Sequence, residues 1–203
     1  GRPQVLIYCD GQPLLVDSGG VNYDRGGLRC CLGGPSGHNV IACQEIPVDD
    51  HLTKTKAVER LSFDLVALEE NEQRLVITNR VTGPEGNHYA WHRTISLQAE
   101  LVRIEDAVEA SEQMHFVSKM HLPDARTGYY LRKCSYQPLE GNTVALRFGD
   151  HMEIVTSDCP FDVTYEPCVD SQNRMNYAQV LTRTHCTTHF TETTTFRFDP
   201  LPT

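Results

Sequence analysis

The sequence has no stretch that approaches the roughly 18 consecutive apolar residues of a membrane-spanning helix. Basic residues are also few, because 18 Lys and Arg stand against 27 Asp and Glu, for a formal net charge of −9 at pH 7. Nucleic-acid binding depends on clustered Lys and Arg that contact phosphates, so this balance disfavours nucleic acid as a partner. The 203 residues are enough for a hydrophobic core, and we expect a single domain over 1–203 without a transmembrane segment.

Zinc-finger spacing of cysteines is missing, although the chain contains eight cysteines. No two of them form a C-x2-C pair, and their spacings fit none of the structural zinc patterns. An even number of cysteines in a chain of this size is typical of oxidised extracellular proteins, whereas free core thiols and a metal site are the alternatives. We therefore predict a secreted or extracellular protein without metal or other cofactor. Disulfide bonds, with a pairing that the sequence leaves open, are expected at Cys9, Cys30, Cys31, Cys43, Cys134, Cys159, Cys168 and Cys186.

Helical periodicity is scarce. Residues 104–114 are the best helix candidate, because Glu and Ala are frequent there, although the apolar stripe is thin. From about residue 58 onward, apolar and polar residues alternate instead. Phe190, Phe196 and Phe198, for example, share one parity while Thr and Arg hold the other. This alternation is typical of half-buried antiparallel strands. The alternating segments are 95–101, 116–122, 144–148, 161–165 and 190–198.

The fold class that follows is all-β: an antiparallel two-sheet β-sandwich, disulfide-bonded and with little helix. Residues 61–68 are apolar at both parities, so we expect a strand in the middle of a sheet, buried on both faces. Nine of the fourteen glycines fall within residues 1–37. This concentration predicts a glycine-rich, loop-dominated N-terminal segment at 10–38.

One motif points to catalysis. The stretch Leu14-Leu15-Val16-Asp17-Ser18-Gly19 places apolar residues before Asp-Ser-Gly and resembles the active-site loop of aspartic peptidases. The resemblance implies that Asp17 shares a proton with a second aspartate. The chain has no second Asp-Ser/Thr-Gly, so the partner aspartate would have to come from a homodimer. We therefore expect no catalysis and keep this enzyme as the alternative.

Two histidine pairs have the spacing of a helical metal clip. His88 and His92 are four residues apart, as are His185 and His189. Both pairs lie in strand-like sequence, where residues four apart share a face but stand roughly 13 Å from each other. We therefore interpret them as exposed or cross-strand histidines and not as metal ligands.

Acidic residues are concentrated between Phe148 and Asn173, where there are six and no Lys or Arg. Such a surface of one sign keeps a protein soluble, and it can also steer a partner of opposite charge toward it. We predict that a protein partner docks here, with a basic protein as the best match and exposed tyrosines as anchors. The expected partner-binding residues are Asp150, Glu153, Asp162, Tyr165, Glu166 and Tyr177.

The predicted function is therefore non-catalytic binding of an extracellular protein, by a receptor, decoy or ligand-binding ectodomain. One alternative is the aspartic peptidase that uses Asp17 in a homodimer. A structural component of an extracellular coat or viral particle is the other. The sequence leaves the identity of the partner and the oligomeric state open.

Overall fold

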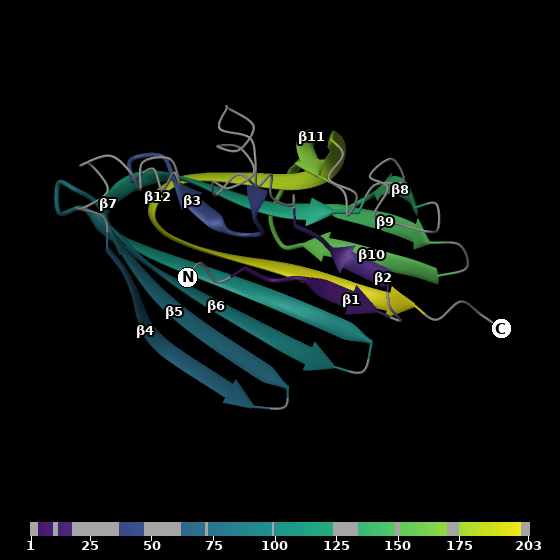
Figure 1. The fold of residues 1–203 in the computed structure, drawn as a ribbon, viewed down its shortest axis with the longest axis horizontal. Helices are drawn as coiled ribbons and strands as arrows, with labels where there is room; N and C mark the ends of the chain where they lie inside the picture. The colour runs from purple at the N-terminus through teal and green to yellow at the C-terminus, as the bar shows by residue number, and fades with distance from the viewer. Residues whose placement is uncertain are drawn as a thin grey trace.

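The computed structural model consists of antiparallel strands and short connections (Figure 1). No helix among the residues that it describes is long and apolar enough to cross a membrane. The described residues are 4–9, 12–17, 37–46, 62–71, 73–98, 100–123, 134–148, 151–169 and 175–199.

Hydrogen bonds join ten strands into one sheet, and β1 and β2 form a separate hairpin. The main path of the sheet has the order β4-β5-β6-β7-β12-β10-β9-β8, while β3 pairs with β7 and β11 with β12. The strands are β1 (Ile7–Cys9), β2 (Gln12–Leu15), β3 (Ile41–Cys43), β4 (Ser62–Asn71), β5 (Arg74–Thr82), β6 (His88–Gln98), β7 (Leu101–Leu122), β8 (Cys134–Leu139), β9 (Thr143–Phe148), β10 (His151–Ser157), β11 (Asp162–Val169) and β12 (Met175–Asp199).

The two longest strands, β7 and β12, each belong to two parts of the sheet. The first half of β7 pairs with β6 and with the second half of β12. The second half of β7 pairs with β3 and with the first half of β12. Both strands turn back on themselves in Figure 1. The sheet therefore folds over, and its two parts enclose a common interior.

An irregularity in the pairing of β7 with β12 lies at this bend. Thr187 pairs with Met114 but His189 pairs with Glu109, so β7 uses more residues than β12 to pass the bend. The buried parity of β12 changes here, from odd positions such as Arg183 to even positions such as Phe190. A β-bulge has this effect because side chains alternate along a strand. Both halves of β12 consequently direct side chains into the interior.

Two apolar clusters fill the interior between the folded-over parts. The cluster beside the bend includes Trp91, Phe116 and Phe190. The cluster farther from the bend includes Ile104 and Phe196. Each cluster contains residues from both halves of β7, so hydrophobic burial holds the two parts of the sheet together.

The prediction of an antiparallel all-β fold is confirmed, and so is the alternation in 190–198, where Phe190 and Phe196 are buried. The helix predicted at 104–114 is wrong, because these residues lie in β7. Two separate sheets are not confirmed, since strand pairing joins ten strands in one sheet.

The strand expected in the middle of a sheet is also misplaced. It corresponds to β4, which lies at one end of the strand order. Apolar residues at both parities indicate burial, but the order of strands depends on how the chain connects them. Of the segment predicted as loop-dominated, residues 12–15 form β2, whereas 10–11 and 18–36 lie outside the described residues.

Candidate functional site

A band of polar side chains crosses the interior between the two apolar clusters. Three buried positions that alternate with outward-facing residues hold a polar side chain where the same face of the strand is otherwise apolar. They are Asp106, Ser118 and Glu192. Buried polar groups are stable only when they are hydrogen-bonded. Ser118 donates a hydrogen bond to Glu192, and Asp106 is hydrogen-bonded to Arg93. We call this set the central polar band; its members are Arg93, Asp106, Ser118, Arg183, Glu192 and Thr194.

One end of the band is a buried ion pair between β6 and β7. Arg93 Nε donates to Asp106 Oδ1 at 2.7 Å, and Arg93 Nη2 donates to Oδ2 at 2.8 Å. Trp91 Nε1 also donates to Oδ1, at 2.8 Å. Arg93 Nη1 reaches the backbone oxygen of Asn39 at 2.6 Å. The pair therefore ties one part of the sheet to the segment that precedes β3 on the other part.

The other end of the band is organised around Glu192. Its Oε1 accepts a hydrogen bond from Ser118 Oγ on β7 and another, at 3.1 Å, from Arg183 Nη1. Its Oε2 lies 2.9 Å from His185 Nε2. The ring of His185 stacks on Phe190, with centroids 3.9 Å apart and planes 11° from parallel. The bend in β12 makes this cluster possible, because it brings Glu192 back over Arg183 and His185.

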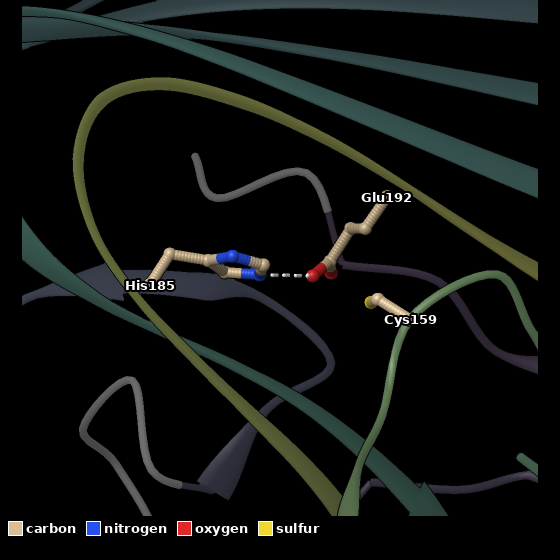
Figure 2. A group of neighbouring side chains, drawn as sticks. All are labelled: Cys159, His185 and Glu192. Atoms are coloured by element: carbon tan, nitrogen blue, oxygen red, sulfur yellow. Dashed lines mark hydrogen bonds and ion pairs between the residues drawn. The ribbon is translucent and has the colours of Figure 1, made fainter.

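Cys159 completes this cluster from the segment after β10. Figure 2 shows its sulfur close to the carboxylate of Glu192, on a different side from His185. The ligand atoms of Cys159, His185 and Glu192 all lie within 4.8 Å of one another. Glu192 is buried, while His185 keeps 18% of its side chain exposed. A thiol, an imidazole and a carboxylate thus converge where solvent can reach, and together they could hold a divalent cation.

Local charges determine the protonation of this cluster. Burial by itself raises the pKa of Glu192, but hydrogen bonds from His185 and Ser118 and the charge of Arg183 outweigh it, so the pKa is lowered. Glu192 is therefore an anion at neutral pH. Burial raises the pKa of Cys159, against the lowering effects of Ser157 and Arg183. Its thiol is consequently protonated at neutral pH.

Asp17, the residue predicted for an aspartic peptidase, lies against a histidine. His38 Nδ1 is 3.2 Å from Asp17 Oδ1 and 3.3 Å from Oδ2, and Gln4 Nε2 also donates to this carboxylate. Such a peptidase needs two aspartates that share a proton. These two contacts of Asp17 are with an imidazole and an amide, and neither group can share a proton with it as a second aspartate does.

The residues predicted to bind a partner do not form one acidic face. Asp162, Tyr165 and Tyr177 are exposed. Glu166 is half-buried and forms an ion pair with Lys119 at 2.7 Å. Glu153 is buried, contrary to its prediction as a surface contact. The last of these residues, Asp150, lies outside the described part of the chain.

The predicted disulfides are not found at three of the cysteines whose side chains the structure describes. Cys43, Cys159 and Cys186 are free, which corrects the prediction for these three residues. Burial raises the pKa of the Cys43 thiol to about 11, so this thiol is unreactive at neutral pH. Cys168 is buried in β11. Only the backbone is described for Cys9 and Cys134, and Cys30 and Cys31 lie outside the described residues.

Sequence reasoning missed the central polar band, although the sequence carries a signal for it. Glu192 and Thr194 share the parity of Phe190 and Phe196, so alternation places them on the buried face. Ser118 stands in the same way between Phe116 and Met120. A polar residue at an apolar parity indicates a buried polar contact. The partners of these residues depend on the bend, which local patterns do not reveal.

The family of the chain is indicated by its sequence. A family model described as Heparinase II/III-like, C-terminal, matches residues 4–192. No curated protein sequence matches the chain.

Solved structures of a heparinase III and of a heparan sulfate lyase have a similar fold. A heparinase III superposes with a TM-score of 0.68 at 13% sequence identity, covering 97% of this chain and 30% of that one. The heparan sulfate lyase HepC from Pedobacter heparinus gives a TM-score of 0.67 at 10% identity, covering 97% of this chain and 30% of the lyase. The chain thus spans about a third of the length of these proteins.

These findings overturn the predicted function. A family match over residues 4–192, together with the heparinase-like fold, contradicts a non-enzymatic, protein-binding ectodomain. It also contradicts the alternatives of an aspartic peptidase that uses Asp17 and of a coat component. The expectation of no enzymatic role was wrong because it rested on the absence of known catalytic motifs. The chain belongs to the heparinase II/III-like, C-terminal family.

Proposed function

We propose that this chain is the β-structured domain of a polysaccharide lyase that acts on an acidic polysaccharide. The match of the family model over residues 4–192 is the observation that carries the proposal. The similarity of fold to a heparinase III and to a heparan sulfate lyase supports it, with TM-scores of 0.68 and 0.67. Heparan sulfate is accordingly the first substrate to test.

The chain acts as a scaffold within the enzyme and does not form the complete active site. It covers only 30% of the length of the heparan sulfate lyase HepC. Its net charge of −9 repels an anionic polymer at long range. The cationic groups that neutralise the substrate are therefore supplied mainly by other parts of the enzyme.

The folded-over sheet suits this role as a sandwich-like scaffold. Two apolar clusters hold its parts together, and the central polar band fixes their relative position through directional hydrogen bonds. Rigid support is what a binding site on the neighbouring surface requires. The extracellular location expected from the cysteine count stays a prediction.

The reaction class can be tested directly with the protein that carries this chain. A lyase breaks the glycosidic C–O bond by elimination, which moves a proton to the leaving oxygen and leaves a carbon–carbon double bond in the other product. We expect the ultraviolet absorbance of an unsaturated uronate to increase when the protein is incubated with heparan sulfate.

Neutral dextran, which has no uronate carboxylate, is the control and should give no absorbance. New reducing ends without the absorbance would identify a hydrolase and contradict the proposal. No cleavage of heparan sulfate, heparin or hyaluronan would contradict it as well.

A further inference from the structure

The cluster of Cys159, His185 and Glu192 combines three ligand types from three separate parts of the chain. His185 and Glu192 come from the two halves of β12, and Cys159 comes from the segment after β10. Their ligand atoms lie within 4.8 Å of one another. A tetrahedral zinc ion holds its nitrogen, oxygen and sulfur ligands roughly 3.3–3.6 Å apart, as follows from bond lengths of about 2.0–2.3 Å. Zinc binding therefore requires that His185 Nε2 and Glu192 Oε2, which are 2.9 Å apart, separate slightly and that the Cys159 side chain moves inward.

The surroundings hold the ligand side chains in place. Ser118 and Arg183 bind Oε1 of Glu192, which leaves Oε2 directed at His185 (Figure 2). Phe190 stacks on the His185 ring and fixes its plane. Hydrogen-bonded carboxylates and oriented imidazoles are the usual supports of a metal site.

The charges of the cluster also fit a divalent cation. Arg183 contributes one positive charge, but its guanidinium is already engaged with Glu192, with Thr194 Oγ1 at 2.5 Å and with Ser157 Oγ at 3.1 Å. Glu192, the nearby Asp158 and a Cys159 thiolate contribute three negative charges. A divalent ion together with Arg183 neutralises them.

We propose that Cys159, His185 and Glu192 form a zinc-binding site with water as the fourth ligand. Thiolate and imidazole together select zinc over magnesium or calcium, which prefer oxygen ligands. Three protein ligands and one open position are typical of an accessible zinc ion. The proposal differs from the sequence-based interpretation of His185 as a histidine that binds no metal, and it does not depend on the lyase function.

Zinc binding changes the protonation of two ligands. Cys159 loses its thiol proton to solvent as the sulfur–zinc bond forms. His185 binds zinc through Nε2, so any proton there leaves or moves to Nδ1. Because protons are released, the affinity for zinc rises with pH.

Alkylation of the native protein tests the site without any mutation. We expect zinc, added at about ten times its dissociation constant, to slow the labelling of Cys159 by iodoacetamide about tenfold, since only free sites react. Labelling of the exposed Cys186, read from the same peptide map, serves as the control and should not change. Equal rates at Cys159 with and without zinc would overturn the proposal.

Cobalt binding gives an independent result. A thiolate-to-cobalt charge-transfer band should appear in the wild type and in Cys186→Ser. In Cys159→Ser and in His185→Asn, the band should lose the absorbance of one bound cobalt ion per protein. Ser118→Ala, which removes a support of Glu192, should weaken binding roughly 10–100-fold. Retention of the full band in a folded Cys159→Ser or His185→Asn protein would rule the site out.

Discussion

At the residue scale, Glu153 is a buried acid whose side chain has little hydrogen-bonding support. It faces the interior from β10, and neither of its carboxylate oxygens has a hydrogen-bond partner among the residues that the structure describes. Burial raises its pKa well above the usual value. The folded state therefore binds this proton more tightly than the unfolded state does. The resulting stability is complete below the unfolded pKa of about 4.3 and is lost as the pH rises through the folded value.

We predict that Glu153→Gln removes this loss, because glutamine cannot ionise. The variant should exceed the wild type in free energy of unfolding by about 1–3 kcal/mol at pH 8 and differ little at pH 4. Urea denaturation at the two pH values measures the difference. The exposed Glu109→Gln is the control, and an equal effect of Glu153→Gln at both pH values would contradict the prediction.

The buried ion pair of Arg93 and Asp106 allows a second prediction. Asp106→Ala leaves the Arg93 guanidinium buried without its counter-charge, which typically costs about 3–5 kcal/mol. Trp91 is the single tryptophan of the chain and contacts Asp106, so its fluorescence reports both the local change and unfolding. Glu105→Ala on the same strand is the matched control. Its ion pair with Arg103 is nearly half exposed, and its loss should cost about 0–1 kcal/mol. Equal costs for the two variants would contradict the structural role of the central polar band.

At the element scale, the alternation of apolar and polar residues predicted strands well, whereas helix propensity predicted a helix where the structure has a strand. The segments 144–148 and 190–198 lie within β9 and β12. Residues 104–114, which are rich in Glu and Ala, lie in β7, because Ile104 and Val108 alternate with outward residues and are buried against the other part of the sheet. Burial of one face outweighs helix propensity, which differs by less than about 1 kcal/mol per residue.

The bend could not be predicted from local patterns. Sequence shows where apolar residues alternate, but nothing in β7 distinguishes a long strand that turns back from two shorter strands. The change of parity in β12 near His189 is visible in the sequence only once its pairing with β7 is known. The contact between Glu192 and Arg183 exists because of that bend. Since the bend was not predicted, the contact was not predicted either.

The hairpin of β8 and β9 provides a test of a single turn. Gly141 has a φ of 69°, in the left-handed region, and a Cβ there would meet nothing within 4 Å. Gly141→Ala should therefore destabilise the protein only through the backbone, by about 1–2 kcal/mol. Gly141→Asn should cost less, because asparagine tolerates this conformation. Equal midpoints of urea denaturation for wild type and Gly141→Ala would show that the turn is not strained.

At the scale of the whole molecule, the sequence led to the all-β class but to the wrong function. Net charge and acidic runs indicated an acidic surface, and the cysteine count indicated an extracellular location. None of these features identifies the reaction that a protein catalyses. The family match links the chain to heparinase-like proteins, although the heparinase III and heparan sulfate lyase structures are only 10–13% identical to it in sequence. Fold at this level of identity reflects a retained pattern of strands, while functional residues depend on the individual site.

The most direct measurement is the mass of the products formed from heparan sulfate by the protein that carries this chain. Elimination adds no water, so the fragments should together weigh as much as the polymer they come from, with one unsaturated end at each cleavage. Fragments whose summed mass exceeds that of the polymer by one molecule of water per bond broken would reveal hydrolysis, and they would contradict the assignment of this domain to a polysaccharide lyase.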